Sequence, residues 1–251
     1  MAVYAVYDKK SISKLFAGWE ETMIWSCLQD CMGAAYADDL YRPLSAQIIL
    51  GGFCFLAGEV NYDLIRNNPD SAFEILVPQN RQWEEAIELI YKDNVVRQTR
   101  YATIKEKDMF DISKLQEIVS RLPEPYELRL IDSTLFEQIM SSNWTVDLCI
   151  NYESYSEYMK NGLGVVILKN GEIVSGASSY TFYIGGIEIE IDTREDKRRK
   201  GLALVCGARL ILECIKRDLY PSWDAYNQGS LALAEKLGYR FDKEYPVYKI
   251  I

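Results

Sequence analysis

Residues 192–204 read DTREDKRRKGLAL, with five Lys or Arg within seven positions, then a glycine, then an apolar run. They follow the alternating segment IEIEIDT, typical of a strand, and lead into GLALVCGARLILECIKRD, typical of a buried helix. The first N–H groups of a helix have no helical partner, and the helix dipole places about half a positive charge there. Gly201, which lacks a Cβ, and the basic run 198–200 therefore predict an anion site, with a pyrophosphate as the expected anion.

The same loop also fits a simpler interpretation as a solvated charged turn. Basic heptads are common, and a single glycine is a weak signal. Leu202 follows Gly201, so the loop lacks the Gly-Lys-Ser/Thr of a phosphate loop. It also lacks the three spaced glycines of a dinucleotide fingerprint. The loop alone leaves both interpretations open, and its flanking segments are needed to choose between them.

Composition limits the kind of partner that the chain binds. Its 251 residues are 49% apolar and 26% charged, which predicts a globular protein with one large or two modest cores. Asp and Glu number 37 against 28 Lys and Arg, and the net charge of −9 argues against nucleic-acid and anionic membrane surfaces. The chain contains no run of about 18 apolar residues, which is the length needed to span a bilayer. The start lacks a basic region followed by an apolar one, so we expect a cytoplasmic protein.

Cysteine and histidine usage excludes several chemistries. The chain has no histidine, so Ser-His-Asp and Cys-His nucleophilic machinery is excluded. Cys27 and Cys31 are spaced for one helix face, but zinc would need two further ligands, and we expect no metal. The six cysteines lie in apolar segments without a disulfide-framework spacing and are interpreted as buried thiols: Cys27, Cys31, Cys54, Cys149, Cys206 and Cys214.

The first half of the chain predicts a smaller α/β domain. Segment 11–39 reads as one or two amphipathic helices. Segment 46–58 reads as strand material, and its paired glycines indicate a tight turn or a bulge. A strand at 71–78 precedes a helix for which Asn80 is the expected N-cap. A further strand and helix follow, and the prolines of PEP at 123–125 stop that helix. We place the domain boundary there, giving domains 1–125 and 126–251.

The second half predicts a mixed, largely antiparallel sheet flanked by helices. YELRLI is a strand, and helices are expected at STLFEQIMSS and around ESYSEYMKNG. The Asn-Gly of KNGE is typical of a type I′ hairpin that pairs LGVVIL with IVSGASSY. A second turn then leads to IEIEIDT, which makes an antiparallel meander. The first half has a similar strand–helix–strand order, which leaves open that it is a degenerate copy of this fold.

Three segments carry a resemblance to a known family. Arg198-x-x-Gly201-x-Ala203 opens a helix directly after a strand, as in the pyrophosphate motif of the GNAT N-acetyltransferases. The segments YPSWDA and NQGSLALAEKLGYRF follow, and the latter resembles the family's Asn-containing loop and Lys-Leu-Gly-Phe/Tyr signature. The resemblance covers about residues 126–251. Within the family, these segments resemble most the subgroup that includes the zwittermicin A resistance acetyltransferase.

This resemblance implies that acetyl-CoA is the acetyl donor. Strand 187–193 and the strand around 219–226 would splay apart, and the pantetheine arm would pair with backbone near Thr193. Ser230 is interpreted as the structural N-cap of the last helix. The implied cofactor-binding residues are Ile191, Thr193, Arg198, Arg199, Lys200, Gly201, Leu202, Ala203 and Asn227.

Acetyl transfer to an amine requires a neutral amine, oxyanion stabilisation and a proton for the thiolate. Many GNAT enzymes keep a base on the strand equivalent to 187–193, so Glu190 is the first candidate for a catalytic base and Glu188 the second. Both also fit the solvent face of an antiparallel strand. Ala234 occupies the position where many relatives carry a tyrosine acid, and Tyr226, Tyr239 or water would have to replace it.

The partners implied are acetyl-CoA and an amine-bearing acceptor, which suits the acidic balance of the chain. Neither nucleic acid nor membrane is expected, and a homo-oligomer is left open. A non-catalytic CoA-binding or interaction protein on the same scaffold is the alternative, because the tyrosine is missing. The identity of the acceptor is not encoded in any motif of the sequence.

Overall fold

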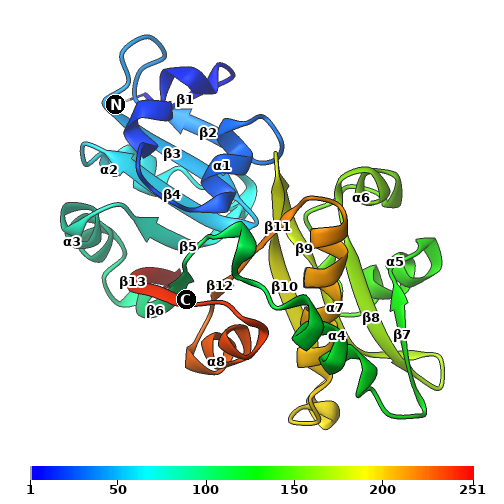
Figure 1. The fold of residues 1–251 in the computed structure, drawn as a ribbon. Helices are drawn as coiled ribbons and strands as arrows, with labels where there is room; N and C mark the ends of the chain where they lie inside the picture. The colour runs from blue at the N-terminus through cyan, green and yellow to red at the C-terminus, as the bar shows by residue number, and fades with distance from the viewer. Residues whose placement is uncertain (1) are drawn as a thin grey trace. The chain divides into compact units, whose positions relative to one another are not determined.

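The computed structural model describes residues 2–251, and the order of its elements is drawn in Figure 1. Two compact units make up the chain: Met1–Arg100 with Glu244–Ile251, and Tyr101–Lys243. Strands β6 (Val95–Thr103) and β13 (Phe241–Ile250) each carry the chain from one unit into the other. The unit that contains residues 126–243 thus begins at Tyr101, before the predicted boundary at residue 125.

The first unit is a mixed sheet covered by short helices. From one edge its strands run β1-β2-β3-β4-β5-β13, and only β4 and β5 are parallel among these pairs. Trp83, Leu64 and Phe55 are among its fully buried side chains. The element bounds are β1 Tyr4–Ala5, α1 Thr22–Leu28, β2 Ala34–Ala37, β3 Ser45–Leu50, β4 Gly52–Gly58, α2 Tyr62–Arg66, β5 Phe73–Pro78 and α3 Arg81–Tyr91, with 3₁₀ turns at 9–11, 13–16, 69–71 and 92–94.

Segment 11–39 differs from its sequence-based prediction. Helix α1 ends at Leu28, and β2 forms at residues that the apolar spacing assigned to a helix. Gly33 has a φ of 84°, and a Cβ there would lie 2.8 Å from the Ile49 carbonyl oxygen of β3. The close approach of β3 therefore decides this turn and the strand after it, which local periodicity cannot register.

The second unit contains a five-stranded sheet in the order β11-β10-β9-β8-β7. Its pairs are antiparallel except β10 with β11, which is parallel. Asn170 and Gly171 both have positive φ in the β8–β9 turn, as the predicted type I′ hairpin requires. The bounds are β7 Tyr126–Leu130, β8 Gly164–Lys169, β9 Glu172–Tyr183, β10 Gly186–Thr193 and β11 Tyr220–Ser222.

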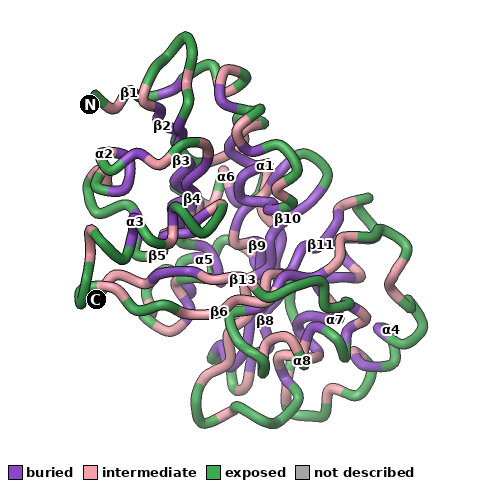
Figure 2. Tube along the Cα trace, turned by 90° about the vertical axis from the view of Figure 1, so that its left-hand side faces the viewer, coloured by how far each residue is buried: buried purple, intermediate pink, exposed green. Residues whose placement is uncertain are grey.

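Helices cover both faces of this sheet. Helix α7 (Leu202–Lys216) packs on β8, β9, β10 and β11, and α4 (Ile112–Ser120) packs on α7. The other face is covered by α5 (Ser133–Met140), the 3₁₀ turn η6 (Val146–Leu148) and α6 (Tyr155–Asn161). Buried residues follow the central strands and α7 in Figure 2. The remaining elements are β12 Asp224–Ala225, α8 Gln228–Leu237, and 3₁₀ turns η5 Lys107–Met109 and η7 Glu195–Lys197.

No helix in residues 2–251 is both long enough and apolar enough to cross a bilayer.

Candidate functional site

Strand β10 loses one of its two neighbours halfway along. Its first residues, Gly186–Glu188, pair with β11, whereas β12 pairs with β6 instead. From Ile189 to Thr193, β10 therefore pairs with β9 alone among the described strands. The predicted splay of the two strands is present in the structure, and it leaves one backbone edge of β10 without a strand partner.

Side chains contact the backbone along this open edge. The Ile191 N–H donates to Oε1 of Glu190 at 3.1 Å, and the Thr193 carbonyl accepts from Nε of Arg198 at 3.3 Å. Side chains rearrange more easily than a strand, so both backbone groups are accessible to an extended ligand. Ile191 and Thr193 are the two predicted cofactor-binding residues on this strand.

Helix α7 begins at the end of the basic loop without a side-chain cap. Its N-cap is Gly201, in the left-handed conformation with a φ of 78° and a ψ of 3°. The first turn contains no acidic residue. A Cβ built on Gly201 would meet nothing within 4 Å, so the space beside the helix end is open. Leu202, Ala203 and the residue after them therefore present N–H groups that an anion can bind.

The five cations of the loop divide into two groups. Arg194 donates to Asp196 at 2.8 Å and to Glu172 at 3.0 Å, and Lys197 also pairs with Asp196. These hydrogen bonds lower the pKa of the Asp196 carboxyl to about 2. Arg194 and Lys197 are therefore neutralised by carboxylates and fix the conformation of the loop.

The three predicted phosphate-binding cations form no ion pair at contact distance with a carboxylate of the described residues, although the charge of Arg198 acts on Asp192. Arg198 donates to the Thr193 carbonyl, and Nζ of Lys200 donates to the Asp196 carbonyl at 3.2 Å. Arg199 is exposed with a φ of 59°. Hydrogen bonds to carbonyls leave the cationic charge unneutralised, so Arg198, Arg199 and Lys200 supply the positive field at the helix end.

The two faces of β10 have different characters. Ile187, Ile189 and Ile191 join the apolar core beneath α7. Glu188 and Glu190 alternate with them and lie on the opposite face. Glu188 is buried, and its Oε1 accepts from the Asp224 N–H at 2.7 Å. Glu190 is half-buried. Both catalytic candidates thus share one face of the strand on which the resemblance implies a base.

The two tyrosines considered for the thiolate acid differ in their surroundings. Tyr239 is buried against Trp223, its hydroxyl donates to the Pro221 carbonyl, and burial raises its pKa well above the ordinary value. Tyr226 is exposed beside Asn227. Tyr239 is a packing residue, and Tyr226 is the tyrosine of the two that solvent or a ligand reaches.

The start of α8 corrects one prediction and adds to another. Ser230 was expected to be the N-cap, but Oδ1 of Asn227 accepts from the Ser230 N–H at 2.9 Å, and Asn227 is the N-cap. The Ser230 hydroxyl instead accepts from Nε1 of Trp223 at 3.1 Å. An Asn three residues earlier is an equally good cap, and burial of Trp223 requires an acceptor for its indole N–H. Asn227 is exposed at this turn.

Sequence reasoning missed four polar residues near Glu188 and Glu190. Asp192 continues the alternation of β10, and burial, with Asp147 nearby, raises its pKa to about 6. Its place in IEIEIDT was a signal that the period of two already contained. Asp147 lies on η6, and Thr181 and Ser222 lie on β9 and β11, so only the folded sheet relates them to Glu188.

The residues in the described part of the chain form no cluster of three or more His, Cys, Asp or Glu suited to a metal ion. Its six cysteines are free thiols, and Cys31 is the one that is not fully buried. Burial raises the pKa of the Cys27 thiol to about 11, as expected for an unreactive core cysteine.

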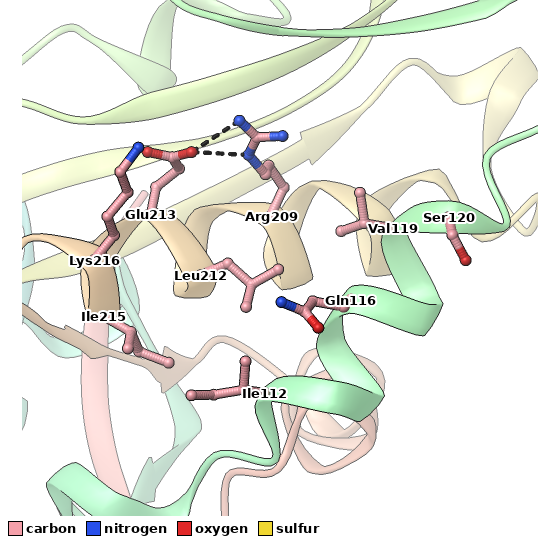
Figure 3. Close-up of a pocket in the computed structure, with 9 residues that line it drawn as sticks. All are labelled: Ile112, Gln116, Val119, Ser120, Arg209, Leu212, Glu213, Ile215 and Lys216. Atoms are coloured by element: carbon pink, nitrogen blue, oxygen red, sulfur yellow. Dashed lines mark hydrogen bonds and ion pairs between the residues drawn. The ribbon is translucent and has the colours of Figure 1, made fainter.

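A groove of about 510 Å³ lies between α4 and α7, away from the basic loop (Figure 3). Ile112, Val119 and Leu212 give it an apolar lining, and Arg209 forms an ion pair with Glu213 at 2.8 Å along one side. Ile112 and Val119 lie on α4, and Arg209, Leu212 and Glu213 lie on α7 where the two helices pack together. The groove therefore contributes nothing to the splayed edge or to the carboxylates.

The described residues form a mixed α/β protein with two mixed sheets flanked by helices, and this confirms the predicted fold class. A family model described as GNAT acetyltransferase matches residues 13–248. The chain therefore belongs to the GNAT acetyltransferase family. The match includes most of the first unit as well as the second.

Two relatives cover nearly the whole chain. The protein is 28% identical over 269 residues to the uncharacterized N-acetyltransferase YdfB of Bacillus subtilis strain 168, with 99% of each chain covered. It is 48% identical to a GCN5-related N-acetyltransferase-like protein from Streptococcus suis 89/1591, whose crystal structure matches with a TM-score of 0.93 over 97% of this chain and 98% of that one. Both are similar along both units.

A more distant structure shares the fold alone. It is a tandem GNAT protein from the clavulanic acid biosynthesis pathway, 9% identical, with a TM-score of 0.58 over 98% of each chain. A two-unit chain is therefore an arrangement that other proteins of this fold also have.

Proposed function

We propose that this protein transfers an acetyl group from acetyl-CoA to an amine of an acceptor. The observation that carries the proposal is the junction of β10 and α7, where an open strand edge leads into three cations without carboxylate partners and an uncapped helix start. Membership of the GNAT family supports it. The cytoplasmic location and the narrower likeness to the zwittermicin A resistance subgroup are parts of the same proposal.

The residues present fit the proposed acetyl donor. The open space beside Gly201 allows a phosphate to approach the backbone, and Arg198, Arg199 and Lys200 supply opposite charge. The N–H groups of Leu202 and Ala203 would bind phosphate oxygens, and the edge of β10 at Ile191 and Thr193 would hold an extended amide chain. Asn227, exposed at the start of α8, would add a further contact. When bound, acetyl-CoA supplies a thioester, which is an acyl group activated toward amines.

Glu190 is the proposed base for the acceptor amine. It is half-buried on β10, and its Oε1 holds the Ile191 N–H at 3.1 Å. If the carboxylate accepts a proton from the amine, this hydrogen bond weakens, and the Ile191 N–H becomes free to donate elsewhere. Glu188 is less accessible, because it is buried and its Oε1 is held by the Asp224 N–H.

A non-catalytic CoA-binding protein on the same scaffold is the second candidate. Ala234 is fully buried in the helix position where many relatives carry a tyrosine, and the Tyr239 hydroxyl is committed to the Pro221 carbonyl. A protein of this kind would bind acetyl-CoA without turning it over in the presence of amines.

Acceptor-dependent release of CoA distinguishes the two candidates. The purified chain is mixed with acetyl-CoA and a panel of amines, and free thiol is measured against the same mixtures without protein. Release above that background with at least one amine supports the transferase. Binding of acetyl-CoA without release from any amine of the panel supports the second candidate.

A further inference from the structure

The face of β10 opposite α7 carries a row of carboxylates, which we call the acidic face: Glu188, Glu190 and Asp192 of β10 with Asp147 of η6. Alternate residues of a strand point to the same side, so the three strand carboxylates project in one direction at intervals of about 7 Å. The same argument gives a span of about 13 Å from Glu188 to Asp192. The acidic face is therefore an extended row rather than a compact cluster.

Turn η6 brings the fourth carboxylate to this row. It packs against both β9 and β10. Asp192 pairs with Gly176 of β9, and a Cβ added to Gly176 would lie 2.6 Å from Cδ1 of Leu148 in η6. Since Asp147 directly precedes Leu148, it lies close to Asp192. The two carboxylates repel each other, and the positive charge of Arg198, in the basic loop, partly offsets this repulsion.

Two buried hydroxyls at the other end of the row have no partner. Thr181 on β9 and Ser222 on β11 are both in register with Glu188, one on each side, so all three side chains share a face. Thr181 is 0% exposed and Ser222 is 1% exposed. Neither hydroxyl oxygen has a hydrogen-bond partner among the described residues. A buried hydroxyl left unpaired costs about 1–3 kcal/mol, so such groups point to a function.

The charge pattern defines the kind of ligand that fits. Repulsion between Asp147 and Asp192 is relieved by a cation, and the hydroxyls beside Glu188 are satisfied by a group that donates hydrogen bonds or accepts them. An ammonium group does the first, and it also donates three hydrogen bonds. One such group near Asp192 and another toward Glu188 would have to be joined by a chain of about 7–13 Å, the spacing of the strand carboxylates.

We propose that the acidic face binds an acceptor with two or more ammonium groups, of which the group at the Asp147–Asp192 end holds the molecule while the other is acetylated. This inference rests on the proposed function for its reaction, but the binding it requires is independent of acetyl-CoA. The net charge of −9 favours the approach of such a cation.

The test measures binding of spermidine, 1,4-diaminobutane and butylamine by calorimetry at low salt without acetyl-CoA. The wild-type chain is compared with an Asp147→Asn, Asp192→Asn double variant. Asp93→Asn with Asp108→Asn is the matched control, because both residues are exposed, lie outside the acidic face, and change the net charge equally. We expect at least tenfold weaker spermidine binding in the double variant, an unchanged affinity in the control, and the weakest binding for butylamine.

Two results would overturn the proposal: equal spermidine affinity in the double variant and the wild type, or butylamine binding as tight as spermidine. If the wild-type chain binds spermidine but does not bind acetyl-CoA, the proposed function is refuted and the cation site stands. The two failures are therefore distinguishable.

Thr181→Val gives a second test, which distinguishes a ligand contact from a purely structural role of the hydroxyl. Valine has the shape of threonine without its hydroxyl, so removal of an unpaired group should raise the melting temperature of the free protein. The same change should weaken spermidine binding several-fold if the hydroxyl contacts the ligand. A higher melting temperature with unchanged spermidine affinity would exclude Thr181 from the site.

Discussion

Helices α3 and α7 both follow a strand of a mixed sheet, but they begin in different ways. At the start of α3, Oδ1 of Asn80 accepts from the N–H groups of Gln82 and Trp83, so the helix satisfies its own first donors. At the start of α7, Gly201 has no side chain to offer, and three cations directly precede it. The first junction is closed by its own sequence, whereas the second leaves its first N–H donors without a side-chain cap.

The strands that lead into the two helices differ as well. β5 ends with Val77 and Pro78, both buried, whereas β10 ends with Asp192 and Thr193, both half-buried, at an edge that lacks a strand partner. One chain thus contains a capped and an uncapped version of the same local arrangement, and we propose that only the uncapped one binds a ligand. Predictions that change one junction without the other test this difference directly.

The largest effect is expected from Glu190→Gln. The amide keeps the size of the side chain and accepts the Ile191 N–H, but it cannot take a proton from an amine. Turnover with an identified acceptor should fall roughly 10²–10⁴-fold, while acetyl-CoA affinity stays the same. Glu74→Gln on the exposed face of β5 is the matched control. Normal turnover in Glu190→Gln together with a loss in Glu188→Gln would move the role of base to Glu188.

Acetyl-CoA itself should stabilise the wild-type chain. A ligand that binds only the native state adds about 2.7 kcal/mol at 100 times its dissociation constant. Melting of the protein with and without acetyl-CoA measures this effect. No shift at millimolar acetyl-CoA would remove the distinction between the two junctions, because α7 would then bind no more than α3 does.

Asp192→Asn should change the pH dependence of stability. The pKa of Asp192 is about 6 in the folded chain, because burial and Asp147 disfavour its charge, and close to 3.9 when unfolded. Between these values the folded chain keeps a proton that the unfolded chain has lost, so stability falls as pH rises from about 4 to about 6. Asparagine removes this cost, which is roughly 1–3 kcal/mol. Solvent screening of the partly exposed Asp192 keeps the cost below the top of this range. Denaturant unfolding should show a more stable variant at pH 8 and no gain at pH 4; equal gains at both would contradict the assignment.

Gly201→Val should weaken acetyl-CoA binding by about tenfold or more, equivalent to about 1.4 kcal/mol. The branched side chain would fill the space through which a phosphate reaches the backbone. Gly18→Val is the matched control, since its φ of 78° and open surroundings give the same backbone strain in the first unit, outside the basic loop. If both variants bind acetyl-CoA equally well, the basic loop is a solvated turn.

The smallest effect is expected at the closed junction. Asn80→Ala removes the side-chain cap of α3 and should lower the free energy of unfolding by about 1 kcal/mol. Acetyl-CoA affinity should not change, because α3 offers no ligand site. Denaturant unfolding and acetyl-CoA titration of the same variant check both statements, and a loss of affinity would show that the first unit takes part in binding.

Short-range chemistry allowed several features to be predicted correctly from the sequence. Asn80 caps α3 and the Asn170–Gly171 turn joins β8 to β9, because each depends on the conformational preferences of one or two residues. The alternation of IEIEIDT correctly placed isoleucines on the core side of β10 and glutamates on the other. The phosphate-binding and catalytic roles of the candidate residues stay predictions.

The tertiary structure decided what depends on residues far apart in the chain. β2 forms because β3 lies beside it, and Ser230 is not a cap because it accepts from the buried Trp223. The basic run does not reveal which of its cations are free to bind, since Glu172 neutralises Arg194 from another strand. Nor does it reveal that Asp147, Thr181 and Ser222 lie near the carboxylates of β10.

The sequence determined where the chain turns and which side of each strand is apolar, since these follow from neighbouring residues. Only the packed sheet determined the polar environment of the site, because hydrogen bonds and charges act between groups that folding alone brings together.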